Sequence, residues 1–116
     1  MNPCEEIIHS LSDCVTACEK CLASCLEEEN VEKMTHCIKL DRDCSDICSL
    51  GVQVLSRQSG VSESIISLCT DICANCADEC EKHDHEHCKK CAETCRQCEE
   101  LCKTYLDNMR QVAMNA

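Results

Sequence analysis

Seventeen of the 116 residues are cysteine, and most of them recur at intervals of three and four residues. Residues at these intervals lie on one face of an α-helix with Cβ atoms roughly 5 to 6 Å apart, so each run places a column of sulfur along a helix. Thiolates are soft ligands, which favour Cu(I), Zn(II) or iron–sulfur clusters over Mg or Ca. The spacing therefore predicts helices that hold soft metal ions. The three columns are Cys14, Cys18, Cys21 and Cys25; Cys69, Cys73, Cys76 and Cys80; and Cys88, Cys91, Cys95, Cys98 and Cys102.

Coordination number and charge distinguish between the possible metals. Zinc in a structural site takes four tetrahedral ligands, whereas Cu(I) accepts two or three sulfurs, so a C-x3-C pair on one helix nearly completes a site. Long uniform columns do not divide naturally into groups of four. Each Cu(I) also cancels the charge of one thiolate, which avoids the cost of burying unpaired charge. The pattern favours storage of multiple Cu(I) ions, with a zinc or general soft-metal thiol buffer as the alternative.

Catalytic and redox functions find less support in the residues. Iron–sulfur motifs wrap one cluster from loops, which a straight helix cannot do, and a redox C-x-x-C would sit at one helix N-terminus next to a βαβ pattern. Electron transfer is thus the weakest of the three hypotheses, after Cu(I) storage and a soft-metal thiol buffer. The sequence contains no phosphate loop, nucleotide fingerprint or Ser-His-Asp constellation that would indicate an enzyme.

Two halves of the chain repeat one pattern. The first column recurs 55 residues later, and Cys37, Cys44 and Cys48 recur 54 residues later in the last column. At the same offset Met34 and Asp41 occupy cysteine positions, so Met34 is a candidate thioether ligand or a core residue. The repeat predicts an all-α fold: an up-down-up-down four-helix bundle of two similar hairpins, with a core lined by Cys. We expect one domain, 1–116, with hairpins at about 3–58 and 62–112.

Turn and cap signals predict where the helices begin and end. Asn2 and Pro3 are a good N-cap and first-turn pair, and Ser62 and Asp84 are the expected caps of the third and fourth helices. Gly51 lies inside the second helix and could allow a bend. The expected helices cover about 3–28, 31–58, 62–82 and 85–109.

The two hairpin turns should meet at one end of the bundle, where metal would enter. Three histidines cluster there. His87 is the strongest candidate ligand because it lies four residues before Cys91, and His83 would extend the third-helix column if that helix reaches it. His85 is weaker, and His9 and His36 should be surface residues. The other end should pack as an apolar plug of Ile7, Ile8, Leu11, Val52, Leu55, Ile65, Ile66, Leu68, Tyr105, Leu106 and Met109.

Composition restricts the partners and the compartment. A formal net charge of −11 without a basic cluster argues against nucleic acid. Residues 1–11 lack the features of a signal peptide, and no run is apolar enough to span a membrane. We therefore expect a reducing cytoplasm, where cysteines are more often ligands or catalysts than disulfides.

These columns, the doubled hairpin and the absent signal peptide resemble the cytosolic bacterial copper storage proteins. The resemblance covers nearly the whole chain, from Cys4 to Cys102. It implies a bundle that holds many Cu(I) ions and a homotetramer. Copper chaperones are candidate partners for delivery, although the sequence itself identifies none. Cys4 lies near the apolar plug and is the least secure ligand. The resemblance carries the core ligands over to Cys14, Cys18, Cys21, Cys25, Cys37, Cys44, Cys48, Cys69, Cys73, Cys76, Cys80, Cys88, Cys91, Cys95, Cys98 and Cys102.

Overall fold

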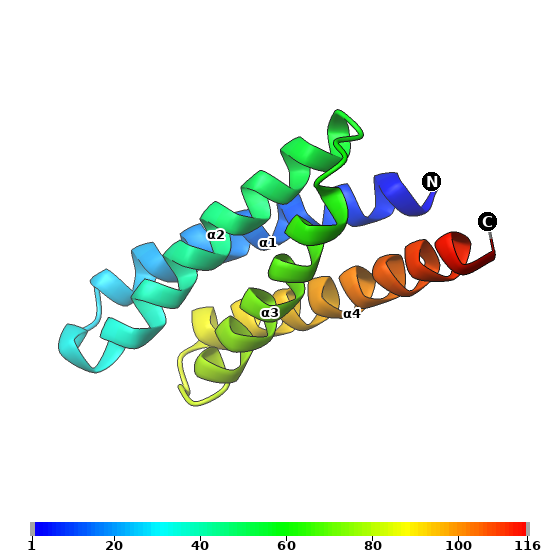
Figure 1. Ribbon diagram of the computed structural model, residues 1–116. Helices are drawn as coiled ribbons and strands as arrows, with labels where there is room; N and C mark the ends of the chain where they lie inside the picture. The colour runs from blue at the N-terminus through cyan, green and yellow to red at the C-terminus, as the bar shows by residue number, and fades with distance from the viewer. Residues whose placement is uncertain (1, 116) are drawn as a thin grey trace.

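The computed structural model describes residues 2–115, in which all regular structure is helical. The helices are α1 (Pro3–Leu26), α2 (Thr35–Ser56), α3 (Ser62–Cys80) and α4 (Glu86–Asn115), and a short 3-10 helix, η1 (Val31–Met34), precedes α2 (Figure 1). The described part of the chain contains no β-strand. The all-α class expected from the cysteine spacing is confirmed.

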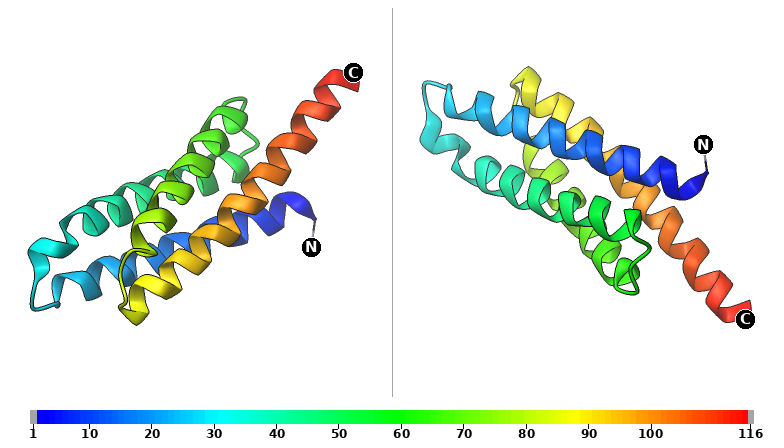
Figure 2. Two further views of the ribbon diagram at one scale, coloured as in Figure 1. Left: turned by 90° about the horizontal axis from the view of Figure 1, so that it is seen from below. Right: turned by 90° about the horizontal axis from the view of Figure 1, so that it is seen from above.

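Each helix packs against two neighbours: α1 and α3 both contact α2 and α4. The α1–α2 and α3–α4 connections lie at one end of the molecule, and both termini point toward the other end (Figures 1 and 2). This is the expected up-down-up-down bundle, with overall extents of 55 × 23 × 22 Å. The last turns of α4 extend beyond the other helices (Figure 2).

Some helix ends follow local capping rules and others do not. Asn2 caps α1 as predicted, because its Oδ1 accepts a hydrogen bond from the Glu5 backbone N–H at 2.8 Å. Ser62 is not the cap of α3. It is the first helical residue, and its hydroxyl donates to the Ser59 carbonyl at 2.8 Å. Asp84 is not the cap of α4 either, since the helix begins at Glu86 and the His85 carbonyl accepts the first backbone bonds.

The lengths of three helices also differ from expectation. Residues 31–34 form the separate 3-10 turn rather than the start of α2, and α3 ends at Cys80, before residue 82. The fourth helix continues to Asn115 instead of ending near 109. Residues 110–115 include arginine, glutamine, alanine and methionine, which favour helix, and they include no Gly or Pro that would end the helix.

The end of the bundle opposite the hairpin turns has an apolar core. Ile7, Leu11 and Ile66 are fully buried there. Leu68 and Met109 were expected in this plug but are 45% and 41% exposed, because their positions on α3 and α4 face outward. Large side chains therefore fill less of this end than the sequence suggested.

Gly51 marks a close approach between helices rather than a bend, since α2 runs unbroken through it. A Cβ atom at this position would lie 2.9 Å from Cys69 Sγ and 3.2 Å from Leu11 Cδ1. Both distances are shorter than an ordinary carbon contact, so only glycine lets α2 pack this tightly against α1 and α3.

Candidate metal centre

The sulfur columns converge inside the bundle. All seventeen cysteines are free thiols; sixteen are buried, and Cys4 is half-buried against the edge of the core. The helical spacing explains this arrangement, because residues at intervals of three and four share one helix face and each of the four helices turns that face inward. The core is thus an array of thiols where most bundles hold leucine.

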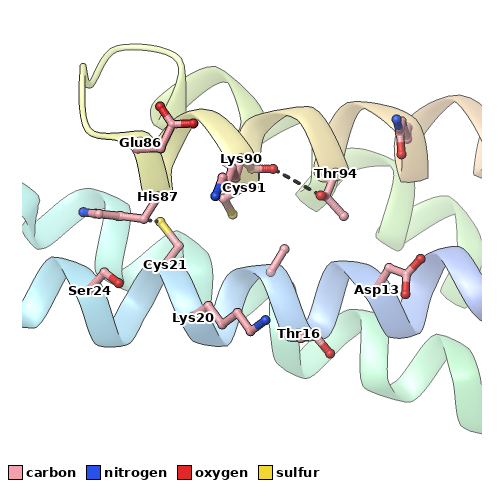
Figure 3. Close-up of a pocket in the computed structure, with 12 residues that line it drawn as sticks. Asp13, Thr16, Lys20, Cys21, Ser24, Glu86, His87, Lys90, Cys91 and Thr94 are labelled. Carbon is pink, nitrogen blue, oxygen red and sulfur yellow. Dashed lines mark hydrogen bonds between the residues drawn. The ribbon is translucent and has the colours of Figure 1, made fainter.

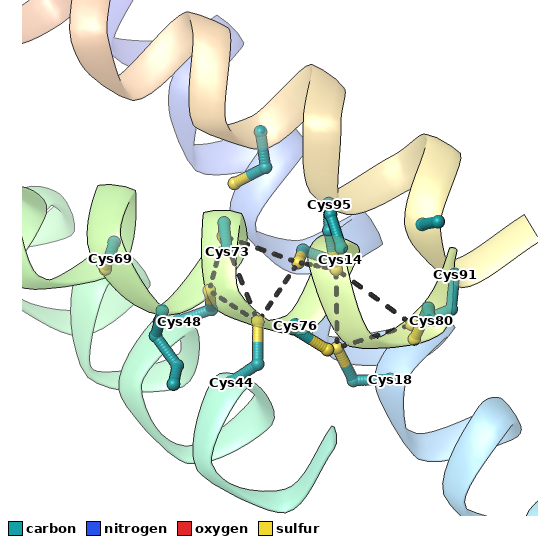
Figure 4. Close-up of a cluster of buried hydrophobic side chains, with 14 of the residues drawn as sticks. Cys14, Cys18, Cys44, Cys48, Cys69, Cys73, Cys76, Cys80, Cys91 and Cys95 are labelled. Atoms are coloured by element: carbon teal, nitrogen blue, oxygen red, sulfur yellow. Dashed lines mark hydrogen bonds between the residues drawn. The ribbon is translucent and has the colours of Figure 1, made fainter. Parts of the chain in front are cut away.

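The centre of the array draws sulfur from all four helices (Figure 4). Cys14 Sγ lies 3.7 Å from Cys44 Sγ, 3.8 Å from Cys73 Sγ and 3.6 Å from Cys95 Sγ. Cys48 Sγ lies 3.6 Å from Cys73 Sγ. One sulfur on α1 therefore contacts a sulfur on each of the other three helices.

These separations match the ligand spacing around a thiolate-bound metal ion. For metal–sulfur bonds of about 2.3 Å, three trigonal sulfurs lie about 4.0 Å apart and four tetrahedral sulfurs about 3.8 Å apart. Several sets of four side chains place all their ligand atoms within 4.8 Å of one another. The sets overlap: Cys14 and Cys44 belong both to a set with Cys48 and Cys73 and to a set with Cys18 and Cys95. Shared ligands indicate one continuous multinuclear site rather than separate tetrahedral sites.

Asp41 is a member of the site that the sequence patterns did not identify. Its side chain is fully buried, and its Oδ1 accepts hydrogen bonds from the thiols of Cys76 at 3.4 Å and Cys91 at 3.5 Å. Burial, and next the negative charge of Cys91, raise the pKa of Asp41 to about 8. The sequence repeat could have identified Asp41 as part of the site, because a charged residue at a position of a buried cysteine column must face thiols.

His87 closes the array at the turn end. Its Nδ1 lies 3.5 Å from Cys88 Sγ, 3.6 Å from Cys21 Sγ and 3.9 Å from Cys25 Sγ, and the four ligand atoms form one candidate metal set. Its Nε2 is buried and has no hydrogen-bond partner within residues 2–115. Glu28 Oε2 lies 4.0 Å from that nitrogen. An imidazole whose Nδ1 faces three sulfurs is suited to bind a metal ion.

His83 and His85 lie outside the sulfur array, whereas Met34 belongs to the buried core cluster that contains the cysteines. The column of α3 does not extend to His83, because the helix ends at Cys80 and the His83 Nε2 pairs with Glu79 Oε2 at 2.8 Å. His85 Nδ1 lies 3.3 Å from Glu28 Oε2, and its ring stacks on His87 with centroids 5.2 Å apart. Met34 is 2% exposed and lines a cavity of about 410 Å³ together with both histidines.

Burial also controls the protonation of the outer thiols. Desolvation, and next the charge of Cys37, raise the pKa of Cys88 to about 12. The pKa of Cys25 is raised by the same two causes in the same order. Both groups are neutral thiols at neutral pH when no metal is bound, whereas the thiolate is the form that binds metal. Loading must therefore release protons from the core.

The remaining core cysteines continue toward the apolar end. Cys69, Cys98 and Cys102 are fully buried, and the Cys69 thiol donates to the Ile47 carbonyl at 3.5 Å.

None of the helices in the described residues is both long enough and apolar enough to cross a membrane.

Comparison with known proteins gives one family. A family model described as copper storage protein matches residues 1–107. Among curated proteins, the uncharacterized cysteine-rich protein YhjQ of Bacillus subtilis is 44% identical over 69 residues, which is 60% of this chain. The match spans 64% of YhjQ, slightly less than two thirds of its length.

Solved structures extend the similarity over most of the bundle. The Cu(I)-bound copper storage protein BsCsp3 is 43% identical with a TM-score of 0.85, and the match covers 89% of this chain and 97% of that one. A cytosolic copper storage protein from Streptomyces lividans, loaded with five coppers, is 40% identical with a TM-score of 0.88 and coverages of 90% and 92%. Another structure of the S. lividans protein, loaded with 10 copper equivalents, has the same identity and TM-score.

Proposed function

The chain belongs to the copper storage protein family, and we propose that it stores and sequesters multiple Cu(I) ions in the thiol core of its bundle. The observation that carries this proposal is the array of sixteen buried thiols, many of whose sulfur atoms lie at metal-bridging distances and belong to overlapping ligand sets. The related proteins solved with copper bound support the same metal.

Charge balance favours Cu(I) over zinc. Sixteen thiolates carry sixteen negative charges, and sixteen Cu(I) ions would neutralise them. Four zinc ions with four thiolates each would use the same ligands but supply only eight positive charges, leaving eight negative charges in a buried core. Unpaired buried charge is strongly unfavourable, so the monovalent ion fits this interior better.

The ligands that we propose lie on all four helices and at the turn end. Asp41 joins the set on geometry alone, and Cys4 remains its outermost member. Met34 lies beside the turn-end cavity, and His83 can join only if it leaves Glu79. The proposed set is Cys4, Cys14, Cys18, Cys21, Cys25, Cys37, Cys44, Cys48, Cys69, Cys73, Cys76, Cys80, Cys88, Cys91, Cys95, Cys98, Cys102, His87 and Asp41, with Met34 and His83 as accessory ligands at the turn end.

We further propose that the bundle is a single domain over residues 1–116 that works without catalysis in the cytoplasm. The similarity to a cytosolic storage protein supports the compartment. A homotetramer and a copper chaperone that delivers the metal complete this proposal, and each is testable by sedimentation and by pull-down with candidate chaperones.

The test is an anaerobic Cu(I) titration of fully reduced protein against a competing chelator, with metal per chain counted at saturation. We expect about one copper ion per buried cysteine, all tightly held. Cys18→Ser, at the centre of the array, should lose copper, whereas Cys4→Ser, the half-buried control, should retain nearly all of it. Saturation at a few ions, or zinc that survives equimolar Cu(I), would contradict the storage proposal.

A further inference from the structure

A groove of about 720 Å³ lies between α1 and α4, close to the hairpin turns (Figure 3). Cavities of roughly 300 to 1,000 Å³ are typical sites for small molecules. Cys21 and Cys91, both only 1% exposed, line the groove together with His87. A molecule bound here would contact the sulfur array from the side of the bundle.

The inner wall of the groove carries side chains that can bind a soft metal ion. Cys21 Sγ lies 3.6 Å from His87 Nδ1 and 3.9 Å from Cys25 Sγ, so an ion that reaches Cys21 has further ligands within bonding reach. The other ring nitrogen of His87, Nε2, is buried and has no hydrogen-bond partner in the described part of the chain. This unsatisfied nitrogen faces outward from the thiol cluster, since the other ring nitrogen faces the sulfurs.

The outer walls of the groove carry a pair of lysines. Because α1 and α4 run antiparallel, Lys20 on α1 lies across from Lys90 on α4, and Asp13 and Glu86 lie toward the two ends (Figure 3). Within residues 2–115, neither lysine ammonium has a carboxylate oxygen within 4 Å, whereas Lys82 and Lys103 are both paired. Their charges are thus available to an anion that binds beside the buried thiols, in a chain whose net charge is −11.

We propose that this groove docks the Cu(I) complex of a low-molecular-weight thiol that bears carboxylates, and that the ion passes from the complex to Cys21. The inference rests on the proposed storage function and adds the class of donor. A Cu(I) ion with two thiolates is an anion, and carboxylates add further negative charge. The net charge of the protein would repel such a complex, and Lys20 and Lys90 offset that repulsion beside Cys21 and Cys91, which line the groove.

The transfer is a ligand exchange without oxidation or reduction. The Cys21 sulfur forms a bond to Cu(I) while its S–H bond breaks, and the bond between Cu(I) and one carrier thiolate breaks. The departing carrier thiolate takes up the proton of Cys21 and leaves as a neutral thiol. A second exchange at Cys25, 3.9 Å from Cys21, releases the other carrier thiol in the same way and leaves the ion between two buried thiolates.

The experiment compares two copper donors on two charge-reversal variants. Lys20→Glu/Lys90→Glu reverses the groove, and Lys39→Glu/Lys89→Glu is the matched control, since both control lysines are exposed and lie outside the groove. Apo protein is mixed anaerobically with Cu(I)–glutathione or with the cationic Cu(I)–acetonitrile complex. Copper on the protein is then measured over time after rapid gel filtration.

We expect the groove variant to take copper from Cu(I)–glutathione about tenfold more slowly than wild type at low ionic strength, with a smaller difference at high salt. Its uptake from Cu(I)–acetonitrile should equal or exceed wild type, and the control should match wild type within about twofold for both donors. Equal rates for the groove and control variants with glutathione would overturn the docking site while leaving storage intact. Failure of wild type to fill from either donor would overturn the storage function itself.

Discussion

Replacing Asp41 with asparagine tests whether a carboxyl group buried among thiols stays protonated in the folded protein. The Asp41 side chain is fully buried and accepts hydrogen bonds from Cys76 and Cys91. Burial, and then the charge of Cys91, raise its pKa from the ordinary value of 3.8 to about 8. The unfolded chain ionises this group near its ordinary pKa, so at intermediate pH the folded protein binds one more proton than the unfolded chain.

The sign of the effect is opposite to that of a salt-bridged carboxylate. Below pH 3.8, the ordinary pKa, Asp41 is protonated in both the folded and the unfolded protein, so its ionisation does not change the free energy of unfolding. Between about pH 4 and pH 8 the contribution of Asp41 lowers the free energy of unfolding by about 1.4 kcal/mol for each pH unit, because folding must neutralise this group. Raising the pH from 5 to 7.5 should therefore cost the metal-free protein about 3 kcal/mol. Asparagine cannot ionise, and its side-chain oxygen still accepts thiol hydrogen bonds, so Asp41→Asn should lose this slope.

Urea unfolding of the reduced, metal-free protein, followed by circular dichroism from pH 5 to 7.5, measures this difference directly. Asp43→Asn is the matched control, because Asp43 lies on the same helix but is exposed. We expect the control to keep the wild-type slope and Asp41→Asn to be more stable than wild type at pH 7.5. Parallel slopes for Asp41→Asn and wild type would refute a protonated Asp41 in the folded state.

Two further predictions concern the mouth of the core and the α2–α3 turn. His87→Ala should weaken binding of the outermost copper by about tenfold in competition with a chelator. His83→Ala should weaken it much less, because an accessory ligand must first leave Glu79; equal losses would mean that His83 binds metal as strongly as His87. Gln58 has a φ of 53°, a left-handed conformation that favours glycine, so Gln58→Gly should raise the stability of the apo protein by about 1 kcal/mol in the same urea assay. A less stable variant would mean that the side chain of Gln58 contributes contacts that outweigh its backbone strain.

Helical periodicity in the cysteines was enough to predict the fold, because a thiol behaves as a small hydrophobe and a column of thiols must be buried like a column of leucines. The cap at Asn2 was also predictable, since its hydrogen bond to Glu5 is entirely local. Ser62 was assigned wrongly because its hydroxyl also bonds to the Val54 carbonyl of the preceding helix at 3.3 Å, a contact that depends on how two helices meet.

The same helical periodicity predicted which cysteines belong to the site, but not its other members. Sixteen of the proposed cysteine ligands point into the core, as their spacing required. The choice between His83 and His87 depended on the path of the α3–α4 connection, which places one ring on Glu79 and the other on the thiols. Spacing shows which positions share a face, but it does not show which helix lies opposite them, and so it could not place Asp41 among sulfurs from α3 and α4.

Asp41 lies where two parts of the thiol array meet. It shares a candidate metal set with Cys21, Cys25 and Cys37 at the turn end, and it also accepts hydrogen bonds from Cys76 and Cys91 farther in. As a neutral acid it adds no charge, so one Cu(I) per thiolate still leaves the core neutral around it. As a carboxylate it would need one additional positive charge nearby to avoid unpaired buried charge. A copper ion bound in addition to one per thiolate would supply that charge. The carboxyl group is therefore costly to ionise in the empty core, and it becomes a ligand only when the core takes up more Cu(I) than it has thiolates.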